Sequence, residues 1–96
     1  MTQIEITKID DFPKAVFDVT LSGNPVTAHR VTLTRDYYEK LTANIVTAEE
    51  LVEESFKFLL AREPNTSILS EFDLTVISKY FSDYEREIKS KFLPGS

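Results

Sequence analysis

The chain has 96 residues, of which 42% are hydrophobic and 28% charged, a composition typical of one small globular domain rather than a disordered segment. Its net charge of −5 at pH 7 disfavours nucleic-acid binding, which depends on positive charge. The absence of cysteine excludes disulfides and thiolate metal sites. With no signal-peptide pattern and no apolar run of about 18 residues, we expect a cytoplasmic protein that does not span a membrane.

Three β-strands are predicted in the first third of the chain, at residues 3–9, 15–21 and 26–34. In each segment apolar and polar residues alternate, which is the period of a strand with one buried face. Two clusters of turn-forming residues, at 10–13 and 22–25, separate the strands. The pattern therefore predicts a three-stranded antiparallel meander whose apolar face is covered by other elements.

A short helix and a longer helix follow the strands. Residues 35–43 are predicted to form the short helix, with Thr34 or Asp36 as its N-cap. The longer helix, residues 48–63, begins with a Thr-x-x-Glu capping box and ends before Pro64. Its apolar residues recur at helical spacing and predict a core-facing stripe, which consists of Leu51, Val52, Phe56, Leu59 and Leu60.

Two further helical segments are predicted after the proline. A cluster of capping residues at 65–67 predicts a helical turn that includes residues 68–69. Asp73 is in position to cap a helix over residues 74–81.

Two arrangements are open for the last helices. Ser82 and Glu85 form a second capping box, which predicts a helix break and a fresh start at Asp83. In the other arrangement one continuous helix carries a single apolar stripe, made of Ile77, Phe81, Tyr84, Ile88 and Phe92. We predict an α+β domain over residues 1–92, in which three to four helices pack on one face of the meander, and a disordered tail at 93–96.

Few residues are available for catalysis. His29 is the only histidine, so any Ser–His–acid triad would have to include it. In the alternating pattern it shares a face with Val31 and Leu33, which places it at the edge of the core, where we expect a hydrogen bond to the backbone. With two glycines in the chain, no glycine-rich phosphate loop is present. We therefore expect a non-enzymatic protein with no metal and no cofactor.

The helical segments carry more aromatic residues than the core of one small sheet needs. Phe58 lies beside the main stripe of its helix, and Tyr80 lies off the stripe of the later helix. Together with Tyr84, these residues predict a partner-binding surface, because interfaces are enriched in aromatic side chains. The alternative is that these rings are ordinary core residues. We expect a protein-interaction domain, and we favour self-association through the helical aromatic residues or a sheet edge, as in a homodimer; binding of a different protein partner is also open.

The third predicted strand also offers an alternative function. The sequence R-V-T-L-T, followed by a short helix and a longer capped helix, resembles the strand–helix–helix order of ribbon–helix–helix DNA-binding proteins. The resemblance covers about a third of the chain and implies a transcriptional regulator in which Arg30, Thr32 and Thr34 enter the major groove. The acidic start of the second helix departs from that family, which contacts phosphates through helix N-termini.

A broader resemblance extends from His29 to Glu85. It rests on the string H-x-V-x-L, followed by E-L-V-x-x-S-F-x-F-L-L-x-R-E-P, S-I-L, F-D-L-x-V-I and Y-F-x-x-Y-E. These motifs are similar to those of a group of short, uncharacterised prokaryotic proteins, some of which have proline at the position of Ser82. The resemblance implies a compact α+β domain with a helix break at that position, and it implies no activity, ligand or partner.

Overall fold

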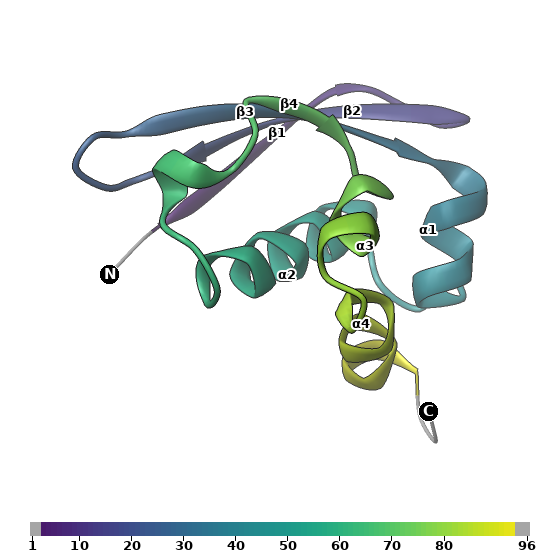
Figure 1. Cartoon of the computed structure of the whole chain (residues 1–96). Helices are drawn as coiled ribbons and strands as arrows, with labels where there is room; N and C mark the ends of the chain where they lie inside the picture. The colour runs from purple at the N-terminus through teal and green to yellow at the C-terminus, as the bar shows by residue number, and fades with distance from the viewer. Residues whose placement is uncertain (1–2, 94–96) are drawn as a thin grey trace.

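A four-stranded sheet covered on one face by helices forms the fold of this chain (Figure 1). The computed structural model describes residues 3–93, so the predicted tail lies outside the described residues except for Leu93. The strands are β1 (Ile4–Asp10), β2 (Lys14–Leu21), β3 (Thr27–Thr34) and β4 (Glu71–Asp73), in that order across the sheet. The helical elements are α1 (Arg35–Thr42), α2 (Ala48–Leu60), the 3₁₀ turn η1 (Asn65–Ser67), α3 (Val76–Tyr80) and α4 (Tyr84–Phe92).

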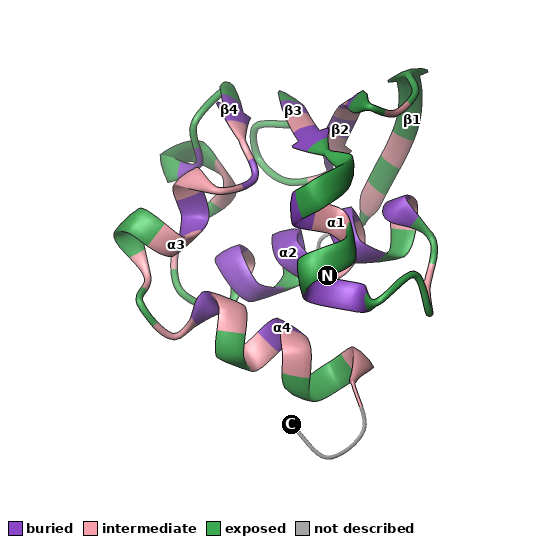
Figure 2. Ribbon diagram, turned by 90° about the vertical axis from the view of Figure 1, so that its right-hand side faces the viewer, coloured by how far each residue is buried: buried purple, intermediate pink, exposed green. Residues whose placement is uncertain are grey.

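The first three strands form the predicted antiparallel meander. On the face toward the helices, β2 and β3 bury every second side chain, and Phe17, Val19 and Val31 have no exposed surface. Figure 2 shows the buried residues concentrated between the sheet and the helices. The opposite face of the sheet is open and mostly polar, as expected for an antiparallel sheet covered on one side.

The fourth strand corrects the prediction of three strands. The helical turn predicted to include residues 68–69 is confined to η1, and the chain then extends into β4. β4 runs parallel to β3, with Glu71 opposite Arg30 and Asp73 opposite Thr32. A strand of three residues is too short to show an alternating pattern in the sequence, and its pairing depends on a strand far away in the chain.

Local capping signals determine where α1 and α2 begin. Thr34 and Thr47 cap these helices, each accepting a hydrogen bond from the backbone N–H three residues later, at 3.3 and 3.1 Å. α2 ends earlier than predicted because the N–H groups of Arg62 and Glu63 both donate to the carbonyl oxygen of Leu59, at 2.9 Å each. This arrangement closes the helix with a tighter turn.

The predicted apolar stripe of α2 lies against the sheet. Four of its residues, Leu51, Val52, Phe56 and Leu59, are buried, and Leu60 is partly buried. They belong to one hydrophobic core with the apolar face of β2 and β3 and with Tyr84 and Ile88 of α4.

The last two helices are separate. α3 ends at Tyr80 and α4 begins at Tyr84, which decides the open question at Ser82 in favour of a break. The second capping box does not form, since no side chain caps the start of α4. Glu85 instead accepts a hydrogen bond at 2.8 Å from the hydroxyl of Tyr37 on α1, so a tertiary contact replaces the predicted local one.

Candidate interaction groove

The structure separates the three predicted partner-binding residues. Tyr80 has 70% of its surface exposed, whereas Phe58 is 6% exposed and Tyr84 is fully buried. The ring of Phe58 contacts those of Phe81 and Tyr84 edge to face, at centroid distances of 5.7 and 5.2 Å, and the guanidinium of Arg62 covers it at 3.6 Å. Phe58 and Tyr84 are thus core residues and cannot belong to an interaction surface. Tyr80 is the one of the three predicted partner-binding residues that is exposed.

The hydroxyl of Tyr84 has a structural partner inside the core. Its oxygen lies 2.6 Å from Oγ of Ser55, and Ser55 lies 2.7 Å from the carbonyl oxygen of Leu51. Because a carbonyl only accepts, Ser55 donates to Leu51 and Tyr84 donates to Ser55. Burial raises the pKa of Tyr84, so its hydroxyl keeps the proton that this bond requires.

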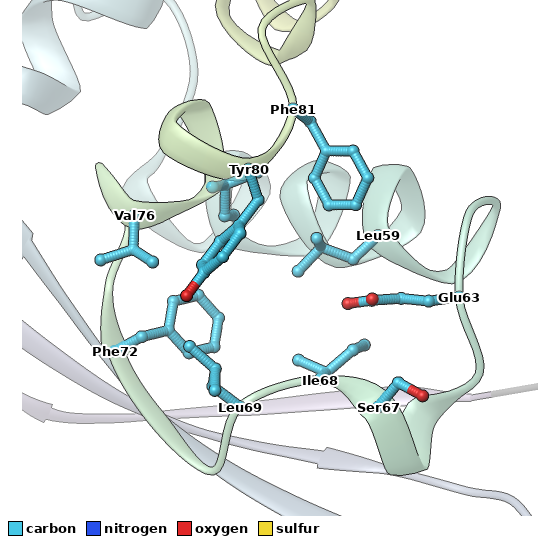
Figure 3. A pocket seen from close by; sticks show the side chains of 10 residues that line it. Leu59, Glu63, Ser67, Ile68, Leu69, Phe72, Val76, Tyr80 and Phe81 are labelled. Carbon is cyan, nitrogen blue, oxygen red and sulfur yellow. The ribbon is translucent and has the colours of Figure 1, made fainter.

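A groove of about 390 Å³ lies between the C-terminal end of α2, the segment from η1 to β4, and α3 (Figure 3). Its size falls within the range of about 300–1,000 Å³ that is usual for ligand pockets. We call it the Tyr80 groove. It is lined by Leu59, Glu63, Ser67, Ile68, Leu69, Phe72, Val76, Ile77, Tyr80 and Phe81.

The walls of the Tyr80 groove are mostly apolar, and two large apolar side chains at its mouth are exposed. Phe72 and Ile77 form part of the walls and are 8% and 2% exposed, while Tyr80 and Leu69 are 70% and 48% exposed. In Figure 3 the ring of Tyr80 extends across the groove toward Leu69 and Phe72. The groove could therefore enclose apolar side chains of another molecule beneath these two residues.

Glu63 is the charged residue that lines the Tyr80 groove. Within residues 3–93, its carboxylate forms no hydrogen bond or ion pair. The neighbouring Arg62 does not neutralise it, because that guanidinium binds the carboxylate of Asp83 at 3.1 Å. The groove thus combines apolar walls with one carboxylate that a basic group could reach.

Hydrogen bonds hold the rim of the groove in place. Asp73, at the end of β4, accepts hydrogen bonds from the backbone N–H and the hydroxyl of Thr75, at 2.9 and 2.8 Å, which turns the chain into α3. The same carboxylate accepts one from Thr32 on β3 at 3.0 Å. The sequence pointed to Asp73 as a helix cap, and here it joins the sheet, the turn and α3.

His29 supports the opposite side of the rim. It is 4% exposed, with Nδ1 2.6 Å from the carbonyl oxygen of Leu69 and Nε2 2.9 Å from Oγ1 of Thr27. Because the carbonyl can only accept, Nδ1 carries a proton and donates it. The expected backbone hydrogen bond of His29 is thus confirmed, and both ring nitrogens already have partners within the chain.

A polar cluster away from the groove joins α1 to α4. Glu85 binds the hydroxyl of Tyr37 at 2.8 Å and the ammonium of Lys40 at 3.1 Å. Partial burial by itself would raise the pKa of Glu85, but the hydrogen bonds from Tyr37 and Lys40 and the charges of Lys40 and Lys89 together lower that pKa below its ordinary value. Burial, followed by the bond to Glu85, raises the pKa of Tyr37.

The residues predicted for the DNA-binding alternative lie on or near the open face of the sheet and already have partners. The guanidinium of Arg30 binds both carboxylate oxygens of Asp18, at 2.8 and 3.1 Å. Thr32 donates to Asp73, and Thr34 caps α1. β3 also lies between β2 and β4, so neither of its edges is free to pair with a second chain over its central residues. The DNA-binding alternative stays a prediction that these contacts do not favour.

Comparison with known protein families, curated proteins and solved structures finds no match for this chain. Among residues 3–93, no group of three or more histidine, aspartate or glutamate side chains is arranged to hold a metal ion. In the same part of the chain, no helix has both the length and the apolar character needed to cross a membrane. The groove geometry is therefore the basis for a functional proposal.

Proposed function

We propose that this chain is a non-enzymatic interaction domain whose Tyr80 groove binds apolar side chains of a protein partner. The observation that carries the proposal is the exposure of Tyr80 and Leu69, 70% and 48%, at the mouth of an apolar groove of about 390 Å³. Exposed aromatic residues beside a preformed pocket are typical of binding sites, because their contact area is large and their entropy loss small.

The charges around the groove favour a basic partner. Glu63 lines the groove, and the neighbouring strand β4 carries Glu71, opposite Arg30, and Asp73 on the open face of the sheet, beside its outer edge. Lys79, next to Tyr80 on α3, supplies one opposite charge. A partner segment with lysine or arginine beside its apolar residues would complement this surface.

The same charges disfavour a second copy of the chain as the occupant. Each copy has a net charge of −5, and an interface built from two such grooves would bring the carboxylates of both copies together. Like-charge juxtaposition at an interface costs several kcal/mol. A different protein is therefore the better occupant than the homodimer that we considered from the sequence.

Selection from a phage-displayed library of random peptides tests this proposal. Peptides selected on the wild-type protein are synthesised, and their Kd is measured by calorimetry on Tyr80→Ser and Leu69→Ser. We expect each variant to weaken binding by about tenfold or more, as the loss of an interface anchor does. The control is Ile45→Ser, which removes a side chain that is 58% exposed in the loop between α1 and α2.

The proposal fails if no peptide is selected. It also fails if the selected peptides bind Tyr80→Ser and Leu69→Ser as tightly as Ile45→Ser. Concentration-dependent dimerisation that Tyr80→Ser abolishes, measured by light scattering without any peptide, would instead identify a second copy as the occupant.

A further inference from the structure

The Tyr80 groove opens beside an edge of the sheet. β4 is the last strand in the sheet order, and among residues 3–93 it pairs with β3 only. In Figure 1 β4 lies in front of β3, on the side of the molecule where α3 lies. Phe72, the central residue of β4, contributes its ring to the groove. The groove and the free strand edge are thus parts of one surface.

We infer that the partner segment binds in extended form and pairs with the outer edge of β4, adding a fifth strand to the sheet. The inference rests on the proposed function and specifies the conformation and chemistry of the occupant. Binding by strand addition takes its affinity from main-chain hydrogen bonds and its specificity from pockets for alternate side chains. β4 and the groove supply both components side by side.

The backbone of β4 has unused hydrogen-bonding groups on its outer edge. The carbonyl of Ser70 accepts from the N–H of Arg30 at 2.7 Å, and the N–H of Leu74 donates to the carbonyl of Thr32 at 2.9 Å. These groups point toward β3, and alternate residues of a strand point their N–H and C=O groups to opposite edges. The N–H and C=O of Glu71 therefore point away from the sheet.

Asp73 presents its backbone groups in the same outward direction as Glu71, since the two residues are separated by one position. Within residues 3–93, no main-chain hydrogen bond to these outward groups is present. The edge thus offers two donors and two acceptors at the spacing of a strand. The Asp73 carboxylate accepts hydrogen bonds from Thr32 and Thr75. These bonds hold the edge in the conformation that an added strand requires.

The side chains of β4 specify the sequence pattern of the added strand. Phe72 is directed to the groove side, whereas Asp73 contacts Thr32 on the open face and Glu71 is exposed. An added strand would alternate in the same way, with every second side chain entering the groove and the others lying beside Glu71 and Asp73. The partner segment should therefore alternate large apolar residues with lysine or arginine.

The acidic edge also disfavours pairing with another copy of the chain. Charged residues on an edge strand discourage unwanted sheet extension, and two β4 strands side by side would oppose carboxylates to carboxylates. The same carboxylates would attract the lysine or arginine side chains of a basic strand. The edge would thus reject acidic or self-pairing strands and admit a basic amphipathic one.

The test uses a synthetic peptide in which leucine or valine alternates with lysine, and a control peptide of the same composition with all lysines at one end. We expect the alternating peptide to bind about tenfold more tightly than the control, because only it satisfies groove and edge together. Tyr80→Ser should weaken its binding, and Ile45→Ser should not. Glu71→Lys should reduce the preference for lysine over glutamate at the alternate peptide positions, because it replaces one of the carboxylates that favour lysine while Glu63 and Asp73 remain.

Amide hydrogen exchange identifies the binding mode. Peptide binding should slow exchange of the amides of Glu71 and Asp73 severalfold, with little change at Phe72, whose N–H points toward β3. N-methylation of one alternate set of peptide amides should abolish binding, and methylation of the other set should preserve it. Protection of both amides together with this alternation would establish strand addition.

Four results would overturn the inference, and they show whether the proposed function fails with it. If groove-dependent binding occurs without protection of Glu71 and Asp73, or if both N-methylated peptides bind equally, the segment is not a strand, although the proposed function stands. If peptides selected on the groove carry apolar residues at helical spacing and the alternating peptide does not bind, the occupant is a helix. If no peptide of either kind binds, the proposed function and the inference both fail.

Discussion

Removing the side chain of Leu59 tests how α2 packs on the sheet. Leu59 is 4% exposed in the core, yet it also lines the Tyr80 groove. A large-to-small change costs the lost transfer free energy plus a term for the cavity that remains, and Leu→Ala changes span about 2–5 kcal/mol. The space left by Leu59 would open onto the groove, so the cavity term is small. We therefore expect Leu59→Ala to lower the free energy of unfolding by about 2–3 kcal/mol.

Two matched leucines provide controls for the Leu59 measurement. Leu51 is fully buried and does not line the groove, so Leu51→Ala should cost about 3–5 kcal/mol. Leu69 is 48% exposed, and Leu69→Ala should change stability by about 0.5 kcal/mol or less. Urea unfolding followed by circular dichroism measures all three. A cost for Leu59→Ala as small as that for Leu69→Ala would refute the packing of this face on the sheet.

Three further measurements probe the polar contacts. Tyr84→Phe removes the donor to the buried Ser55 and should cost about 1–2 kcal/mol in urea unfolding; an unchanged midpoint would contradict a structural role for this hydroxyl. Thr34→Ala should cost about 1 kcal/mol through loss of the α1 cap, and a stability equal to wild type would show that the cap contributes nothing. The pKa of Glu85 is lowered in the folded state, so its stabilising contribution is present above the unfolded value near 4.5 and is lost as pH falls through the folded pKa. Tyr37→Phe should therefore flatten the fall of the unfolding free energy below about pH 5, measured by urea titrations at each pH, and an identical pH profile would count against this linkage.

The aromatic residues show what sequence patterns could and could not predict about the site. The position of Tyr80 off the apolar stripe of α3 correctly indicated an exposed side chain, and the structure leaves it 70% exposed. The same reasoning failed for Phe58 and Tyr84, because α3 and α4 fold back so that Phe81 and Tyr84 cover Phe58. The break between α3 and α4 creates that packing, and helical spacing within one segment carries no information about it.

The groove itself had no signal in the sequence. Its walls come from α2, from the segment between η1 and β4, and from α3. Glu63 becomes part of a binding groove only because these elements meet in the fold. Of these elements β4 is the hardest to predict from the sequence, because it has three residues and pairs with β3, a strand that lies far from it in the sequence. Asp73 was predicted to cap a helix over residues 74–81, which is wrong: α3 spans Val76–Tyr80 with Thr75 at its N-cap position, and the Asp73 carboxylate instead accepts a hydrogen bond from the backbone N–H of Thr75 in the turn before the helix.

The amino-acid sequence by itself determined the meander, the starts of α1 and α2, and the apolar face of α2. These features depend on side-chain alternation, helical spacing and capping residues, all of which act between neighbours in the chain. Tertiary structure decided the parallel strand β4, the burial of Phe58 and Tyr84, and the Tyr80 groove. These features require groups far apart in sequence to meet, so the free energy that selects them exists only once the core has formed.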